Sequence, residues 1–204
     1  MPRPRSLTPD QVASAALAVI DRDGLAALSM RAAAVELGMS TMALYRYVAD
    51  RDELEALVVE LVLGGVDTRP PPGDLPWAER VRIMVGRVRD AVGAHPAVVP
   101  LTMTHRHRSP ALLRWSETLV AVLADAGVEG EDRVVALRGV IGYVIGAIQL
   151  EHLGPLAGPG TDVIADLPAD AFPYMSETAR HARSVGADRE FFGWLALLLR
   201  GIER

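Results

Sequence analysis

The chain has 204 residues, a formal net charge of −5 and no cysteine. This length is enough for one large domain or two small ones with a hydrophobic core. The absence of cysteine excludes disulfides, thiolate metal sites and a cysteine nucleophile. The N-terminal segment lacks the apolar stretch of a secretory signal, and the longest uncharged apolar run, residues 139–150, has 12 residues where a membrane span needs about 20. We therefore expect a soluble cytoplasmic protein.

The first helix is marked by a capping motif. Thr8 is a capping residue, Pro9 suits the first helical position, and Gln11 completes a capping box. An apolar stripe follows and ends at Asp23 and Gly24. These signals predict a helix over residues 9–23.

Residues 29–48 contain two short helical patterns joined by a turn at Gly38. Ser40 is placed to accept a hydrogen bond from a free amide at the start of the second pattern, and Leu44 and Val48 share one face of it. Two helices joined by a short turn containing glycine are the signature of a helix-turn-helix, whose second helix enters a DNA major groove. The alternative is an ordinary helical hairpin in a protein core.

Helical patterns continue through the rest of the chain. Asp50 and Glu53 form a second capping motif before an apolar helix that breaks at residues 64–65. Further helices are predicted over 74–94, 109–127, 132–153, 168–183 and 188–202, with a short apolar piece at 97–103 and a Gly/Pro-rich loop at 154–162. No run of alternating strands is present, so we predict an all-α fold. Its domains are a helix-turn-helix domain at 1–66 and a helical effector-binding and dimerisation domain at 74–204.

Two of the late helices have no polar face. The helix at 132–153 is apolar nearly all round, and residues 191–199 are apolar round the whole circumference. Such helices need to be buried on every side. They are either central core helices of one subunit or half of a four-helix bundle between two subunits, and two-fold symmetry also suits a protein that reads two half-sites. We favour a symmetric dimer with an interface formed by Gly139, Gly142, Gly146, Phe191, Trp194, Leu195 and Leu198.

Residues 8–65 resemble the DNA-binding domain of the TetR family of bacterial repressors. The likeness rests on Asp23-Gly24-Leu25, on Ser-Met-Arg at 29–31, on Glu-Leu-Gly-Met-Ser at 36–40, and on Leu-Tyr-x-x-Val at 44–48 followed by a capped helix. Ala43 stands where the family often has glycine. The C-terminal two thirds resemble the tetracycline repressor branch only in their helical layout. The resemblance implies a homodimer that binds a double-stranded DNA operator and is released when an unidentified small molecule enters a C-terminal pocket.

The resemblance and the groove-facing end of the second hairpin helix together suggest which residues contact DNA. Arg31 is expected to contact a base or a phosphate, Met42 and Ala43 offer methyl contacts to thymine, and aromatic hydroxyls one turn later suit phosphate. Two alternatives apply to Arg3 and Arg5: they form a DNA-contacting arm, or they belong to a terminus that takes no part in binding. The full predicted set is Ser29, Met30, Arg31, Ser40, Thr41, Met42, Ala43, Tyr45, Arg46, Tyr47 and Arg51.

The charge of the N-terminal region argues against DNA binding. Residues 1–66 hold six arginines and nine acidic residues, a net charge of −3. A DNA-reading domain is normally basic. The arginines, however, fall in the N-terminal arm and around the hairpin, whereas most of the acids fall on other segments. The distribution of these charges along the chain therefore supports a DNA-binding face, although the net charge of the region does not.

Effector-binding residues are expected among polar and aromatic groups on otherwise apolar helices. The predicted set is Met103, His105, Trp115, Tyr143, Gln149, His152, Phe172 and Tyr174. His105 and His107 have no third ligand at diagnostic spacing, so we expect neither a metal nor any other cofactor. No nucleophile elbow, phosphate loop or HExxH motif is present, and we expect no enzymatic activity.

The sequence therefore predicts a ligand-responsive, dimeric DNA-binding transcriptional regulator, specifically a repressor released from a palindromic operator by a small molecule. The alternative is a small-molecule-binding helical protein in which DNA reading is weak or lost.

Overall fold

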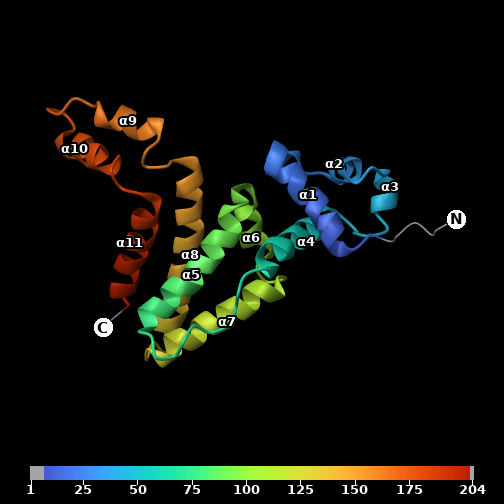
Figure 1. The fold of residues 1–204 in the computed structure, drawn as a ribbon, viewed down its shortest axis with the longest axis horizontal. Helices are drawn as coiled ribbons and strands as arrows, with labels where there is room; N and C mark the ends of the chain where they lie inside the picture. Colours follow the sequence, from blue (N-terminus) through green and yellow to red (C-terminus); the bar gives the residue numbers. More distant parts are fainter. Residues whose placement is uncertain (1–6, 203–204) are drawn as a thin grey trace. The chain divides into compact units, whose positions relative to one another are not determined.

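The computed structural model describes residues 7–202, and Arg3 and Arg5 of the predicted arm lie outside this range. The described chain is helical without strands, which confirms the predicted all-α class (Figure 1). Helix α1 spans Pro9–Asp23 and begins with the predicted capping box, in which Thr8 Oγ1 accepts from the Gln11 amide and Gln11 bonds back to the Thr8 amide. Helix α1 ends at Gly24, where φ is +84°.

The helix-turn-helix lies where the sequence predicts it, but its second helix ends at Leu44 and not at Val48. A short 3-10 helix, η1 (Leu25–Ala27), leads into α2 (Met30–Glu36), and α3 (Thr41–Leu44) follows the turn. Gly38 has φ of +66°, a left-handed conformation that side-chain-bearing residues rarely adopt. Leu44 and Val48 are both fully buried, as their shared face predicts.

The central helices also follow the sequence patterns. Asp50 caps α4, and the described helices of this part are α4 (Arg51–Gly64), α5 (Trp77–Gly93), η2 (Pro96–Val98), α6 (Val99–His105) and α7 (Pro110–Asp125). The core of α4 is Leu54, Val58, Val59, Val62 and Leu63. The predicted start of α5 at residue 74 is three residues too early.

The C-terminal part departs from the predicted boundaries in two places. It comprises α8 (Gly130–Leu153), α9 (Pro159–Ala165), α10 (Pro173–Ala182) and α11 (Ala187–Arg200). Helix α9 begins inside the predicted loop, and α10 begins five residues after the predicted start. In both cases a proline occupies the first turn, where its missing amide hydrogen is not needed. The prediction that Pro159 belongs to a loop is therefore wrong, whereas Pro173 lies inside the predicted helix 168–183 and begins α10.

The described chain forms two compact units. One contains residues 7–69 and 86–118, so α1–α4 and α6 belong to the same unit. The other contains residues 70–85 and 119–202, including α8–α11. The division into functional domains at 1–66 and 74–204 is a separate matter and stays a prediction.

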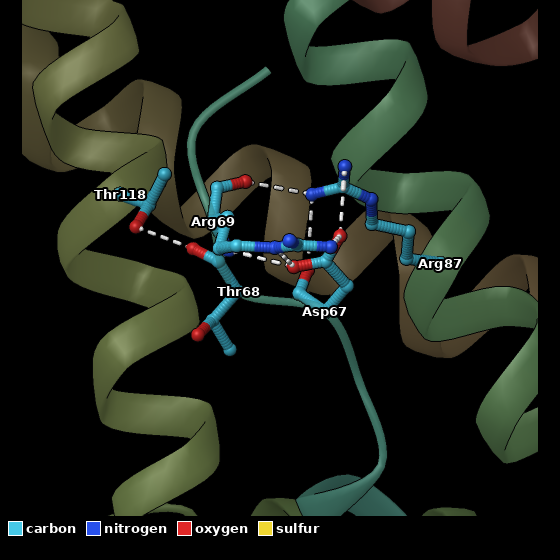
Figure 2. Close-up of polar contacts among 5 residues, drawn as sticks. All are labelled: Asp67, Thr68, Arg69, Arg87 and Thr118. Atoms are coloured by element: carbon cyan, nitrogen blue, oxygen red, sulfur yellow. Dashed lines mark hydrogen bonds and ion pairs between the residues drawn. The ribbon is translucent and has the colours of Figure 1, made fainter.

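The linker after α4 is fixed by a polar cluster within the first unit (Figure 2). Asp67 accepts hydrogen bonds from the Arg69 side chain and amide, and Arg87 donates to the carbonyls of Asp67 and Arg69. Thr118 Oγ1 donates to the Thr68 carbonyl at 3.0 Å. The hydrogen bonds from Arg69, aided by the charge of Arg87, lower the pKa of Asp67 from its ordinary value of 3.8 to about 2. The linker is therefore held to α5 and α7 in this unit.

Replacing Asp67 should remove a pH-dependent contribution to the stability of the folded protein. Because the pKa of Asp67 is lowered in the folded state, its contribution is present above about pH 4 and is lost as the pH falls towards 2. We expect Asp67→Asn to have a slightly lower Tm than the wild type at pH 6 and the same Tm at pH 2. Thermal unfolding across this range, with the exposed Asp170→Asn as control, measures the difference. A gap that stays constant down to pH 2 would contradict this assignment.

Helix α8 is long and apolar enough to cross a membrane by length and composition. The prediction from sequence, which counted only the uncharged run, missed this. Core helices of water-soluble proteins share the same length and composition, so this property alone assigns no membrane role.

Candidate nucleic-acid interface

Serine side chains cap both helices of the helix-turn-helix. We call the second of them, α3, the reading helix. Ser29 Oγ accepts from the Ala32 amide at the start of α2, and Ser40 Oγ accepts from the Ala43 amide at 3.2 Å at the start of α3. Both serines are in extended backbone conformation, as N-cap residues are. Leu44, the last residue of α3, is buried, whereas Met42 near the start of the same helix is exposed to solvent.

Most predicted DNA contacts lie on accessible surface. Met42 is 76% exposed, Tyr45 is 47% exposed, and Arg31, Ser40, Arg46 and Arg51 are exposed as well. Ser29, Thr41, Ala43 and Tyr47 are partly exposed. Met30 is the exception: at 8% exposure its side chain belongs to the core. The predicted DNA contact of Met30 stays a prediction, and its buried side chain packs in the core beneath α2.

The arginines differ in how they are engaged. Within residues 7–202 Arg31 forms no ion pair, so its guanidinium is available to an external anion. Arg46 Nε donates to the carbonyl of Ala43, at 3.5 Å, and Arg51 pairs with Glu55 at 2.7 Å. Among these three arginines of the described hairpin and the next helix, the side chain of Arg31 alone has no hydrogen bond or ion pair within residues 7–202.

The structure accounts for the acidic total of the N-terminal region. Its carboxylates pair with Arg22, cap α4, or contact residues 95–109: these are Asp21, Asp23, Glu36, Asp50, Asp52, Glu53, Glu55 and Glu60. None of these eight lies in α3. The acidic residues that give the region its net charge of −3 are therefore mostly engaged in contacts within the unit. They do not lie on the surface of α3.

The cap at Ser40 should contribute to stability. Ser40→Ala removes the acceptor for the Ala43 amide and is expected to lower the free energy of unfolding by about 1 kcal/mol. Urea unfolding without DNA measures this. Ser40→Asn is the matched control, because asparagine caps helices equally well, and an equal loss in both variants would show that the cap is not responsible.

The predicted effector residues are divided between the two units. In the first unit Trp115 is buried, Met103 is half-buried, and His105 is 1% exposed with Nε2 at 3.2 Å from Glu55 Oε2. In the second unit Tyr143 is buried and donates to the Phe191 carbonyl, whereas Gln149 is half-buried and His152, Phe172 and Tyr174 are exposed. Their joint role in a pocket stays a prediction.

A cavity in the second unit was not anticipated from the sequence. It has a volume of about 510 Å³ and lies among Trp77, the turn at 126–129, α8 and α11. None of the eight predicted effector residues lines it. Gly139 and Leu198, both predicted at the dimer interface, do. No sequence motif marks this cavity, because its walls come from three separate segments.

The apolar late helices are only partly covered within one chain. Helices α8 and α11 pack against each other, and Phe191 and Leu195 are buried between elements of the same subunit. These two residues are core residues of one subunit, and their place at a dimer interface stays a prediction. Trp194 and Leu197 remain exposed on α11, and a side chain added at Gly142 or Gly146 would meet no atom within 4 Å.

The α2–turn–α3 geometry defines a helix-turn-helix protein. Residues 69–204 match the family model described as the tetracyclin repressor-like C-terminal domain. The chain therefore belongs to the TetR family, as the N-terminal motifs indicated.

Known relatives include named repressors. The chain is 32% identical over 146 residues to the HTH-type transcriptional repressor DrrR1 of Streptomyces coeruleorubidus, an alignment that covers 72% of this chain and 54% of the relative. Among solved structures it is similar to ActR of Streptomyces coelicolor in complex with (S)-DNPA, with a TM-score of 0.81, 28% identity and 96% of each chain covered. BioQ with its double-stranded DNA operator gives a TM-score of 0.71 and 26% identity over 97% of this chain and 98% of that one.

Proposed function

We propose that the chain is a ligand-responsive, dimeric DNA-binding transcriptional regulator, and specifically a repressor released from a palindromic operator by a small molecule. The observation that carries this proposal is the capped reading helix α3, with Met42 and Tyr45 exposed, next to the unpaired, exposed Arg31. Membership of the TetR family and the likeness to BioQ bound to its operator support it.

The dimer is supported by exposed apolar surface on α8 and α11. Trp194 and Leu197 lie three residues apart on α11, and Val135, Gly142 and Gly146 follow one another at helical spacing on α8. A second copy would cover these faces and bring two reading helices onto one DNA duplex. We assign the dimer interface to this surface, with Gly139 and Leu198 at its edge.

The small-molecule effector is supported by the likeness to ActR, whose structures contain (S)-DNPA and actinorhodin. An apolar C-terminal domain with a few buried polar groups suits such ligands. We propose that the protein has no enzymatic activity and binds no cofactor. We also propose that it works in the cytoplasm, where the DNA is.

Selection of genomic fragments by the purified protein tests DNA reading directly. Fragments bound at moderate salt should be enriched in a palindrome whose half-site centres lie about one or more helical turns apart. Affinity should also fall steeply with salt as counterions are released from the phosphates. A folded dimer that enriches no sequence would instead support the alternative, a small-molecule-binding protein with lost DNA reading.

A further inference from the structure

The cavity of about 510 Å³ in the second unit lies where separate segments of that unit meet. Its walls are the start of α5 at Trp77, the turn between α7 and α8, the first half of α8 and the end of α11. Small residues keep the space open, because glycine and alanine have little side chain to fill it. The small residues of the lining are Ala126, Gly127, Ala136, Gly139 and Gly201. A volume of this size is typical of sites for small organic molecules.

The walls of this cavity are fixed by contacts within the same unit. Arg80 lies one turn after Trp77 on α5, is buried, and has Nη1 at 3.0 Å from Oδ2 of Asp125, the last residue of α7. The turn that follows is closed by hydrogen bonds from the amides of Gly127 and Val128 to carbonyls of α7, and Gly127 has the positive φ, +78°, that such a turn requires. The cavity is therefore preformed, and a ligand does not have to order these walls.

Among the described residues the lining of the cavity carries acidic side chains and no basic one. The two acids are Glu129 and Asp132 at the start of α8, and we call this space the acidic cavity. Neither carboxylate has a hydrogen bond or an ion pair within residues 7–202, and Glu129 does not cap α8 although it stands at the N-cap position. Acidic residues are favoured in the first turn of a helix by its dipole. Glu131 meets that preference too but does not line the cavity, so it distinguishes a helix effect from a ligand site.

The rest of the lining is aromatic or apolar. Trp77 is half-buried, and tryptophan is the side chain whose ring attracts cations most strongly. Val135, Leu198 and Ile202 add apolar surface. A hydrated inorganic cation gains nothing from such a surface, and an anion is repelled by both carboxylates. The lining therefore suits an organic cation that has an apolar body.

We propose that the acidic cavity binds a small organic cation, whose positive group lies near Glu129 and Asp132 and whose aromatic or aliphatic body lies against Trp77 and the wall formed by α8 and α11. The site is built from residues of a single chain. Binding to the chain does not depend on the proposed function, and only a role of the ligand in releasing DNA rests on it. A second copy of the chain is the competing occupant, because Gly139 and Leu198 also lie at the edge of the proposed dimer interface.

Two matched ligands test the site in the absence of DNA. Benzyltrimethylammonium carries an aromatic ring and a permanent positive charge, whereas phenylmethanesulfonate has the same benzyl group and a tetrahedral head of opposite charge. The full chain, with nitrogen-15 in its tryptophan indoles, is titrated with each ligand and followed by NMR, and Trp77→Phe assigns the Trp77 signal. We expect benzyltrimethylammonium to shift the Trp77 signal to saturation and to leave that of Trp115, in the first unit, unchanged. Phenylmethanesulfonate should shift neither signal.

Charge variants then test the two carboxylates. Glu129→Gln and Asp132→Asn should each raise the dissociation constant of benzyltrimethylammonium by about 2- to 5-fold, as expected for an exposed charge contact. Glu131→Gln removes the same charge from the same helix turn without changing the cavity lining, and should leave the constant nearly unchanged. All three side chains are exposed, so the fold is expected to tolerate each change.

The proposal is overturned if Trp77 shows no saturable shift, if the two ligands bind equally, or if Glu131→Gln weakens binding as much as the cavity variants. Repeating the titration with Leu197→Glu, a change on α11 intended to separate the two copies, tests the competing occupant. Saturable binding to both proteins supports the site, whereas binding to the separated chains alone would show that a second copy fills the cavity. Failure to bind any DNA would remove the proposed function and leave the binding result unaffected.

Discussion

Leu197→Glu should convert the proposed dimer into a monomer. Leu197 is 60% exposed on α11, so the glutamate is tolerated in one subunit, but it would be buried without a partner when a second copy covers this face. We expect the dimer dissociation constant to rise by about 100-fold or more, as for central interface residues. Sedimentation or light scattering across protein concentrations measures this. Operator affinity should fall with it, because one reading head contacts one half-site only.

The choice of Leu197 avoids a complication at Trp194. Trp194 packs edge-on against Tyr143 of its own subunit, with ring centroids 5.2 Å apart, so changing it also disturbs the core. Leu113→Glu is a suitable control, because Leu113 is an exposed leucine on α7 outside the proposed interface. A Leu197→Glu protein that remains dimeric at the same concentrations as the control would refute the α8–α11 interface.

Arg31→Ala should weaken specific binding by about 1–3 kcal/mol per half-site if Arg31 reads a guanine. The effect enters twice in a symmetric complex, so the total loss for a dimer on its operator is expected to be larger than for one contact. Since Arg31 is exposed and has no ion pair within residues 7–202, its replacement should leave stability unchanged. Titration of labelled operator measures the affinity, and thermal unfolding checks the fold.

Salt dependence separates the two possible roles of Arg31. A phosphate contact would reduce the salt slope by about 1 per half-site and weaken all sequences alike, whereas a guanine contact relaxes specificity at one position. Arg180→Ala, an exposed arginine on α10, is the control and should change neither quantity. An unchanged operator affinity in Arg31→Ala would place this side chain outside the interface.

Local signals in the sequence were sufficient to predict where several helices start and where the helix-turn-helix lies. The Thr8 and Asp50 caps, the Ser40 cap and the left-handed Gly38 are interactions within a few residues, and all are present as predicted. Proline was the ambiguous signal, because Pro159 and Pro173 both suit a loop and the first turn of a helix. Here the helix starts at the proline.

Contacts between distant segments could not be predicted from such signals. The carboxylates of α4 look in the sequence like a solvated acidic face, and only the fold brings them to His105, Arg108 and Ser109, about 50 residues away in the chain. The same applies to Phe191 and Leu195. Their apolar helix has a buried side and an exposed side, and periodicity alone did not tell which side belongs to the subunit core.

The most direct test of a dimeric DNA reader is the dependence of affinity on half-site spacing. Once an enriched palindrome is known, its half-sites can be moved apart. About 5 additional base pairs place the two half-sites on opposite faces of the duplex, and about 10 additional base pairs return them to the same face. We predict a large loss of affinity for the first, partial recovery for the second, and weak binding to a lone half-site. Equal affinity for the lone half-site, the shifted operator and the native operator would contradict the account.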